Sequence, residues 1–298
     1  MNKRCAIIGS TGYIGKHLVH YLQSVYHIEP ECYDVVPNDG TMSHYMQIDL
    51  TNKESLQNLN LDVDYLFAFD GLTGTHVSFE RYEQYTKVNE IGLLNLLDYI
   101  SQSPYRPRIV YPSSRLVYKG ADRPLQEEAE KEAKTMYAVE KIACEYALEA
   151  YQHRFGIPYI VFRICVPYGN MLKGDYSYGT IGAFVRRARS KEDISLYGGG
   201  DTKRTFTHIE DVCYHIVNGA FTYEGQGDVF NVGGETLSLR DAAQIIADKY
   251  GVKVLSVDWP EKDLLIESGH TYFDDSKIRS LLSQTYTYKL LEAYVNDL

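Results

Sequence analysis

The most constraining feature of this sequence is a set of three glycines, spaced three residues apart, between an apolar run and a helical pattern. The run Arg4–Ile8 predicts a buried strand, and apolar residues spaced four, four and three apart predict a helix over Tyr13–Val25. Gly9, Gly12 and Gly15 join the two. Residues without a Cβ permit a tight turn close to a pyrophosphate, and a helix N-terminus adds free N–H groups and a partial positive charge. The motif predicts a dinucleotide-binding strand–turn–helix unit; the alternative is an ordinary turn.

Short strand-like runs alternate with helical patterns through the first half of the chain. Strands are predicted at Glu31–Asp34, Met46–Asp49, Tyr65–Phe69, Arg108–Tyr111 and Tyr159–Arg163, and helices at Tyr82–Ile100 and Glu130–Phe155. Strands that alternate with helices are joined by right-handed crossovers and pair in parallel. The pattern therefore predicts an α/β fold built on a parallel sheet.

The second half of the chain, after Arg163, has a different pattern. Residues 166–205 are rich in Gly and Tyr and contain a helical stretch near 178–189. Helices are predicted at Ile209–Thr222 and Leu239–Tyr250, and a short strand at Val229–Asn231. We therefore expect a main domain of residues 1–165 plus about 206–231, and a smaller lobe of about 166–205 and 232–298.

Charge and cysteine usage exclude several classes of partner. The net charge is -10, from 30 basic and 40 acidic residues, which disfavours binding to nucleic acid or to an anionic membrane. The 5 cysteines are scattered and lack the spacing of metal ligands, so we expect reduced thiols and no metal site. The apolar run near the start is too short for a signal peptide, and no stretch is long enough to span a membrane. We expect a cytoplasmic protein.

A carboxylate at the end of the second predicted strand bears on the choice of dinucleotide. Asp34 can accept a hydrogen bond from the 2′-hydroxyl of an adenosine ribose, and its charge repels a 2′-phosphate. No Lys or Arg occurs between Asp34 and Lys53. We therefore expect NAD rather than NADP, with a turn aspartate as the alternative. Asp49 and Leu50 end the third strand at the same edge, where a contact with adenine is expected.

A tyrosine and a lysine lie four residues apart in a strongly helical stretch. Tyr137 and Lys141 are therefore expected on one face of a helix. An ammonium group beside a tyrosine hydroxyl stabilises the phenolate and lowers its pKa toward neutrality. Ser113 and Ser114 follow a predicted strand, at the edge where chemistry gathers in parallel sheets. The pattern predicts a tyrosine acid/base with a serine partner; the alternatives are a charged surface helix and a loop-capping serine.

Together these residues resemble the extended short-chain dehydrogenase/reductase family, in its NAD-dependent sugar epimerase and dehydratase branch. Further matches to the family's motifs follow along nearly the whole chain: Asn89, Gly92, Asn95, Leu96 and Leu97; Ser113 to Tyr118; Arg163, Tyr168 and Gly169; Gly198, Gly200, Arg204, Phe206, His208 and Asp211; and Asn231 to Gly233. The resemblance implies an α/β, Rossmann-type doubly wound parallel sheet with a smaller C-terminal substrate-binding lobe. The cofactor contacts that it implies are Gly9, Thr11, Gly12, Tyr13, Ile14, Gly15, Asp34, Asp49, Leu50, Asn89, Tyr137 and Lys141.

The resemblance also implies a role for each site residue. Tyr137 is the acid/base, Ser114 is its partner on the substrate, and Lys141 holds the nicotinamide ribose. Arg204 binds the diphosphate of a nucleotide-diphosphate sugar, a role that suits a bidentate guanidinium. Val166 occupies the position of a substrate-binding Asn in many members. A homodimer formed through the two long helices of the first half is expected.

Departures from the family pattern bear on the reaction. A 4,6-dehydratase carries Asp-Glu after the catalytic hydroxyl, whereas this chain has Arg115 and Leu116, which cannot eliminate water. Asp70 replaces a small residue beside the cofactor, and in the tail only Lys262 is offered as a second cation for the diphosphate. We expect a C4 epimerase that forms a 4-keto intermediate and returns the hydride from bound NAD. The alternatives are an NAD(P)H-dependent reductase of a nucleotide-linked 4-keto-deoxysugar and a non-catalytic dinucleotide-binding regulator.

Overall fold

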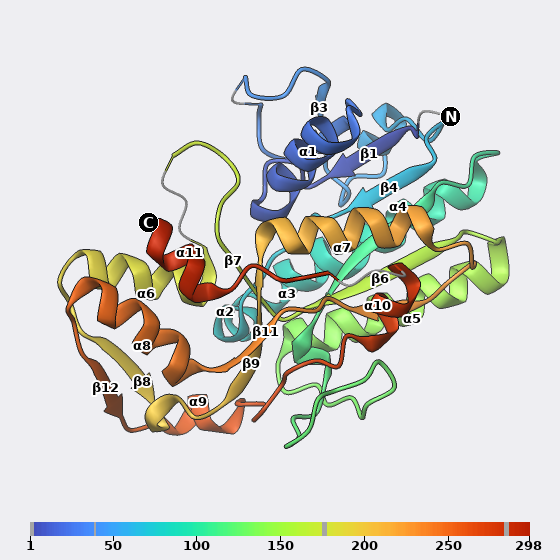
Figure 1. The fold of residues 1–298 in the computed structure, drawn as a ribbon. Coiled ribbons are helices and arrows are strands. Elements are labelled where there is room, and N and C mark those ends of the chain that lie inside the picture. The colour runs from blue at the N-terminus through green and yellow to red at the C-terminus, as the bar shows by residue number, and fades with distance from the viewer. Residues whose placement is uncertain (1–2, 39, 175–177, 283–285) are drawn as a thin grey trace.

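The structure is a computed structural model that describes residues 3–38, 40–174, 178–282 and 286–298 (Figure 1). Its centre is a seven-stranded sheet with the order β10-β6-β5-β4-β1-β2-β3, and every neighbouring pair is parallel. The strands are β1 (Cys5–Ile8), β2 (Glu31–Asp34), β3 (Tyr45–Gln47), β4 (Tyr65–Ala68), β5 (Arg108–Ser114), β6 (Tyr159–Ile164) and β10 (Val229–Asn231). The predicted α/β class with a doubly wound parallel sheet is confirmed.

Helices cover both faces of this sheet. One face packs against α1 (Tyr13–Tyr26), α7 (Ile209–Thr222) and α10 (Ser276–Leu282), and the other against α4 (Gly92–Gln102) and α5 (Met136–Phe155). Because successive side chains of a strand point to opposite faces, Ile7 of β1 joins the first core and Ile8 joins the second. Burial on both faces explains why these strands are continuous apolar runs in the sequence.

The remaining elements gather on one side of the large sheet, beyond its carboxyl edge (Figure 1). They form a three-stranded sheet of order β11-β9-β7 and a two-stranded sheet of β12 and β8. Their bounds are β7 (Val166–Tyr168), α6 (Gly179–Arg189), β8 (Ile194–Tyr197), β9 (Lys203–His208), β11 (Glu235–Ser238), α8 (Leu239–Tyr250), β12 (Val254–Val257), α9 (Glu261–Leu265) and α11 (Leu291–Asp297). A separate apolar core joins α6, α8 and α11.

The division into a main domain and a smaller lobe stays a prediction, but two packing facts bear on its boundaries. Strand β10 pairs with β6 and so belongs to the large sheet. Ile278 of α10, from the tail that was expected to lie in the smaller lobe, is fully buried in the core that contains α1 and α7. After β10 the chain leaves the large sheet and packs against it once more at α10.

The helix predicted over residues 82–100 is present, but it contains a π-helical turn that the periodicity did not predict. The chain forms α2 (Thr75–Glu80), α3 (Tyr82–Tyr85), a π-helical turn over Thr86–Ile91 and then α4. The π turn carries Asn89, which is buried and bonded by its side chain to Leu72 and Glu140. Turns of this kind occur frequently at functional sites, and a single 3.6-residue period misses them.

The helix predicted over residues 130–155 begins six residues late, at Met136. Thr135 is its N-cap, and the Thr135 hydroxyl accepts a hydrogen bond from the N–H of Ala138 at 3.1 Å. Residues before the cap bond to another segment instead, since Glu132 N–H donates to Val117 C=O at 3.0 Å. Strand boundaries also differ, because β3 ends at Gln47 rather than Asp49 and β5 extends to Ser114.

Candidate active site

Close backbone packing explains the glycine motif between β1 and α1. Gly9 has a φ of +79°, and a Cβ there would lie 2.5 Å from the backbone of Phe69 and Asp70. A Cβ on Gly15 would lie 2.0 Å from the carbonyl oxygen of Gly9. Helix α1 begins directly after Gly12, which has no side chain to cap the helix, and the first turn contains no acidic residue. The turn therefore presents an uncapped, electropositive helix terminus, which fits a pyrophosphate.

The carboxylate of Asp34 lies beside this turn, at the end of β2. One carboxylate oxygen, Oδ2, accepts hydrogen bonds from the Thr11 N–H at 2.9 Å and the Thr11 hydroxyl at 2.7 Å. The other oxygen, Oδ1, accepts from the N–H groups of Val35 at 2.7 Å and Val36 at 3.3 Å. A carboxylate offers about four acceptor positions. A ribose hydroxyl at Asp34 therefore has to share or replace the hydroxyl of Thr11.

A cavity of about 400 Å³ opens at the carboxyl edge of the large sheet, next to the glycine turn. Its size lies within the range of ligand pockets. The predicted site residues on its wall are Gly12, Tyr13, Ile14, Gly15, Ser114, Tyr137, Lys141 and Val166. A larger cavity of about 990 Å³ lies between α1, α6 and α11, but its described lining contains none of the predicted site residues. The 400 Å³ cavity is therefore the candidate active site.

The other predicted contacts lie away from this wall. Asp49 accepts a hydrogen bond from Thr51 N–H at 2.8 Å, and the carbonyl of buried Leu50 accepts from Asn95 Nδ2 at 2.9 Å. These bonds hold the chain after β3 against α4. Among the described residues, neither Asp49 nor Leu50 lines the 400 Å³ cavity.

Asn89 acts on the cavity through the loop after β4. Its Oδ1 accepts from Leu72 N–H at 2.7 Å, and its Nδ2 donates to Leu72 C=O at 3.1 Å and to Glu140 Oε2 at 2.8 Å. Leu72 lines the cavity, whereas Asn89 does not. Asn89 therefore fixes the loop to α5, and its contact with the cofactor stays a prediction.

Tyr137 and Lys141 both reach the cavity from the first turns of α5. Lys141 Nζ donates to the Tyr111 hydroxyl at 3.0 Å and to Pro112 C=O at 2.8 Å, and lies 5.7 Å from the centre of the Tyr137 ring. Burial lowers the pKa of Lys141. Burial likewise raises the pKa of Tyr137, although the hydrogen bond with the Ser114 side chain opposes the rise. Burial is the largest cause of the shift, so in this structure the pKa of Tyr137 lies above its ordinary value, and the effect of Lys141 on the phenol stays a prediction.

The two serines at the end of β5 have different partners. The Ser113 hydroxyl donates to Glu145 Oε1 at 2.6 Å, within a buried network. The Ser114 hydroxyl accepts from Leu116 N–H at 3.2 Å and caps the short helical turn Arg115–Val117. Since the hydroxyl of Ser113 already donates a hydrogen bond to the carboxylate of Glu145, Ser114 is the serine that remains to interact with Tyr137.

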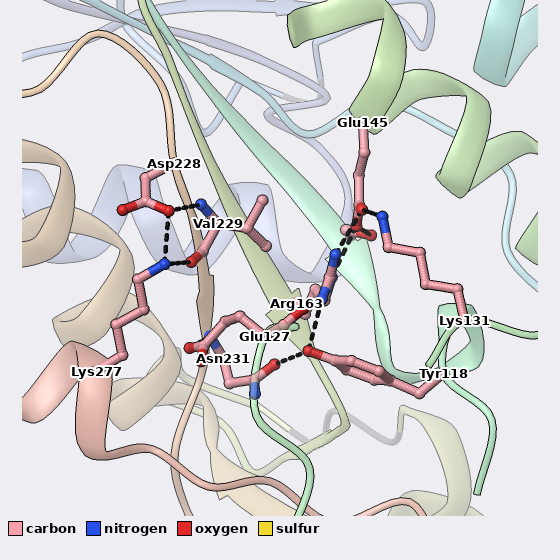
Figure 2. Close-up of polar contacts among 10 residues, drawn as sticks. Tyr118, Glu127, Lys131, Glu145, Arg163, Asp228, Val229, Asn231 and Lys277 are labelled. Carbon is pink, nitrogen blue, oxygen red and sulfur yellow. Dashed lines mark hydrogen bonds and ion pairs between the residues drawn. The ribbon is translucent and has the colours of Figure 1, made fainter. Parts of the chain in front are cut away.

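The network behind Ser113 centres on a buried pair of Arg163 and Glu145 (Figure 2). Arg163 donates to both carboxylate oxygens of Glu145 at 2.9 and 2.7 Å, and to the Tyr118 hydroxyl at 2.7 Å. Tyr118 donates in turn to Asn231 Oδ1 at 2.7 Å. Burial alone would raise the pKa of Glu145, but the hydrogen bonds from Arg163 and Ser113 outweigh it and the pKa is lowered. The network ties α5, β5, β6 and β10 together behind the cavity.

Arg204 of β9 is bonded within the protein in this structure. It is 2% exposed, and its guanidinium donates to Glu267 Oε1 at 2.6 Å, to Gly269 C=O at 2.5 Å and to Lys203 C=O at 2.9 Å. It does not line the 400 Å³ cavity, nor a neighbouring cavity of about 160 Å³, as far as the described residues show. These bonds tie β9 to residues 267–269, and the contact of Arg204 with a diphosphate stays a prediction.

Two charged residues on the cavity wall were recognised in the sequence only as departures from a family pattern. Asp70 follows Phe69 at the end of β4, and burial raises its pKa to about 6 while the charge of Lys141 opposes the rise. Arg115 follows Ser114 directly and lines both the 400 Å³ cavity and a neighbouring one of about 160 Å³. The signal that could have identified both is the charge itself, placed directly after a buried strand at the carboxyl edge.

Two kinds of feature are absent from the described residues, a membrane-spanning helix and a cluster of metal ligands. No helix there is long and apolar enough to cross a membrane. No group of three or more His, Cys, Asp or Glu side chains in that part of the chain could hold a metal ion.

Comparisons with known proteins agree with the geometry. The model of the NAD dependent epimerase/dehydratase family matches residues 5–233. UDP-N-acetyl-alpha-D-glucosaminuronate decarboxylase of Bacillus cytotoxicus is 25% identical, over 83% of this chain and 80% of its own. UDP-glucuronate 4-epimerase of Thermodesulfobacterium geofontis is 25% identical, over 80% of this chain and 73% of its own. The crystal structure of UDP-glucuronic acid 4-epimerase from Bacillus cereus, in complex with UDP-glucuronic acid and NAD, shares the fold with a TM-score of 0.81 at 20% identity, over 98% of this chain and 96% of that one.

Proposed function

We propose, from the premise that this chain belongs to the NAD dependent epimerase/dehydratase family, that it epimerises a nucleotide-diphosphate sugar at C4. Membership makes it an enzyme of the extended short-chain dehydrogenase/reductase type. The observation that carries the proposal is a single cavity whose wall includes Ser114, Tyr137 and Lys141 on one side and the glycine turn on the other. A hydroxyl acid/base and a dinucleotide site that face one cavity suit the oxidation of a secondary alcohol.

The proposed cofactor is NAD rather than NADP. The uncapped N-terminus of α1 suits a pyrophosphate, and the carboxylate of Asp34 suits a ribose 2′-hydroxyl. No cation between Asp34 and Lys53 is available to neutralise a 2′-phosphate. When bound, NAD would supply a hydride acceptor that later acts as the donor, and its oxidised ring would add a positive charge to the site.

In the proposed reaction, the positive charges of Lys141 and of the oxidised cofactor would offset the effect of burial and favour the phenolate of Tyr137. The phenolate would take the proton of the C4 hydroxyl, the hydride from C4 would pass to the cofactor, and a carbonyl would form. Ser114 holds the C4 oxygen, and Lys141 holds the cofactor ribose from the position where it now contacts Tyr111. The 4-keto sugar then turns over, Tyr137 returns the proton, and the hydride returns to the opposite face of C4. Val166 gives the sugar an apolar wall where other members offer an amide.

Two observations limit the alternatives. Elimination of water needs an acid and a base next to the 4-keto group, and the residues after Ser114 are Arg115 and Leu116. A dehydratase is therefore disfavoured. A reductase would use the same Ser114, Tyr137 and Lys141, and on the wall of the same cavity Asp70 and Val166 depart from the family pattern. Reduction of a nucleotide-linked 4-keto-deoxysugar by NAD(P)H is therefore the second candidate.

The test is to incubate purified protein with UDP-, dTDP-, GDP- and CDP-sugars, without added cofactor, and to follow the products by NMR. An epimer formed over many turnovers supports the proposal, since it requires that the hydride return from cofactor retained by the protein. No product, followed by turnover only with a 4-keto-sugar and NADH or NADPH, replaces the proposal by the reductase. If neither occurs while NAD still binds, a non-catalytic regulator is favoured.

We also propose a homodimer, formed through α4, α5 and the turns before α4. Large apolar side chains on these elements are exposed, among them Tyr82 at 52%, Ile91 at 42% and Tyr146 at 57%. Light scattering after size-exclusion chromatography tests this proposal. The wild type should have twice the mass of the chain, and Tyr146→Glu should be monomeric; a monomeric wild type would contradict it.

A further inference from the structure

We propose that Arg115, rather than Arg204, binds the diphosphate of the substrate. This inference rests on the proposed function, because it assumes that a nucleotide-diphosphate sugar occupies the cavity beside Ser114 and Tyr137. It concerns the position after the proposed catalytic hydroxyl, where this chain departs from the family's pattern.

Arg115 lies between two cavities. Arg115 and Leu116 lie on the wall that the 400 Å³ cavity shares with the 160 Å³ cavity. The 160 Å³ cavity is also lined by Tyr197 and Trp259, whose rings pack with centroids 5.2 Å apart. A sugar beside Ser114 and a base beside these aromatic rings leave the diphosphate, which joins them, at the shared wall.

The guanidinium of Arg115 uses few of its hydrogen-bond donors within the described part of the protein. Nη1 of Arg115 donates to the Thr271 hydroxyl at 3.0 Å, and in the described part of the chain Arg115 forms no ion pair. A guanidinium has five N–H donors. Burial, followed by the charge of Arg204, lowers the pKa of Arg115 to about 10, so the group is still a cation at neutral pH. The charge of Glu267 opposes this lowering, but Glu267 is itself bonded to Arg204. In the described residues the cation of Arg115 has no ion pair of its own, and a bound anion would offset the cost of its burial.

Arg204 is a poor alternative because its charge is already neutralised. Glu267 Oε1 accepts from Arg204 Nη2 at 2.6 Å and from Gly269 N–H at 2.9 Å. Glu267 lines the smaller cavity, but its bond to Arg204 neutralises the charge that would repel a phosphate. Asp263, the other acid on that wall, lies 3.5 Å from His76. Arg115 is therefore the cation that remains to bind a substrate anion at the shared wall.

The experiment measures binding by isothermal titration calorimetry to wild type, Arg115→Gln, Arg115→Lys and Arg123→Gln. Arg123 is an exposed cation on the following loop, so its variant is a control for the change in net charge. The probes are UDP, dTDP, GDP and CDP, and then UDP-glucose and UDP-glucuronate. For the diphosphate that wild type binds best, Arg115→Gln should weaken binding about tenfold or more. Arg115→Lys should weaken it less, and Arg123→Gln should bind as wild type does.

Each outcome separates the inference from the proposed function. Equal losses for the free diphosphate, the neutral sugar and the uronate support a diphosphate contact. A loss confined to UDP-glucuronate overturns it and assigns Arg115 to a carboxylate on the sugar, and unchanged binding of every probe overturns it outright. If wild type binds no nucleoside diphosphate, the proposed function fails before Arg115 is in question. Should Arg115→Gln not fold, Arg115→Lys decides, since wild-type affinity in a variant that lacks the bidentate fork contradicts the inference.

Discussion

Two regions at the carboxyl edge of the large sheet each contain an arginine, and they use it in opposite ways. Arg163 of β6 pairs in register with Ser113, and Arg115 follows Ser114 directly. Arg163 is closed in by Glu145, Tyr118 and main chain (Figure 2). Arg115 faces two cavities with one hydrogen bond, to a threonine.

The difference shows which arginine stabilises the fold and which one is available to bind a ligand. A buried ion pair whose donors are mostly used holds four elements in one arrangement, and breaking it leaves an uncompensated charge. A cation whose donors are mostly unused contributes little to the fold and is available to a ligand. We therefore expect the region of Arg163 and Glu145 to determine stability, and the cavity wall from Ser114 to Leu116, with Tyr137, to determine turnover.

The largest expected effect on stability comes from Glu145→Leu. This change leaves Arg163 buried without its carboxylate, which should lower the free energy of unfolding by about 3–5 kcal/mol. Urea unfolding followed by circular dichroism measures it. Glu149→Leu, one turn further along α5 at an exposed position, is the matched control and should change stability by less than about 1 kcal/mol. Equal losses in the two variants would abolish the distinction between the regions.

The opposite result is expected at Tyr137. Tyr137→Phe keeps the ring and removes the acid/base, so kcat should fall roughly a hundredfold to a thousandfold, while the midpoint of urea unfolding stays near that of wild type. Steady-state kinetics with the sugar identified by NMR measures this loss. Tyr146→Phe, exposed on the same helix, is the control and should keep full activity. Full activity of Tyr137→Phe would remove the assignment of Tyr137 as acid/base.

The adjacent serines give a finer test, since one belongs to each region. Ser113→Ala removes a hydrogen bond to Glu145 and should cost about 1–3 kcal/mol in stability, with little change in kcat. Ser114→Ala should lower kcat about a hundredfold, because a positioned donor to the reacting oxygen is lost, and should cost at most about 1 kcal/mol in stability. Measuring both quantities for both variants decides. The reverse pattern would exchange the roles of the serines.

The smallest expected effect is a difference in pH dependence between two carboxylates. Glu145 has a lowered pKa, so its contribution to stability is present above its unfolded pKa and is lost as the pH falls through the folded pKa. Asp70 has a pKa raised to about 6, so its contribution is present below its unfolded pKa and is lost as the pH rises through about 6. Relative to Asp70→Asn, wild type should lose on the order of 1 kcal/mol between pH 4 and pH 7. Parallel curves for the two proteins would show that Asp70 titrates normally.

Much of the framework could be predicted from the sequence because it depends on local pattern. Strands Glu31–Asp34 and Val229–Asn231 and helices Ile209–Thr222 and Leu239–Tyr250 have the bounds that their periodicity predicts. The π turn at Asn89 and the late start of α5 were missed, because bonds between distant segments override a helical period there.

The candidate site divides in the same way. Ser114, Tyr137 and Lys141 line one cavity, and their sequence positions on a strand end and one helix face were sufficient to bring them together. The partner of Arg204 was not predicted, since a charged residue in a strand does not reveal whether a carboxylate 63 residues later will neutralise it.

The sequence alone determined that this chain has a parallel sheet, a dinucleotide turn and a tyrosine–lysine pair on one helix, because the spacing of apolar residues and glycines encodes each of them within a few residues. Only the tertiary structure decided the partners of each serine, which arginine is neutralised and in which direction the pKa of Tyr137 moves. Those properties depend on burial and on partners from other segments, such as Glu145 for Ser113 and Glu267 for Arg204. Desolvation and pairing are properties of the packed chain, so local spacing cannot supply them.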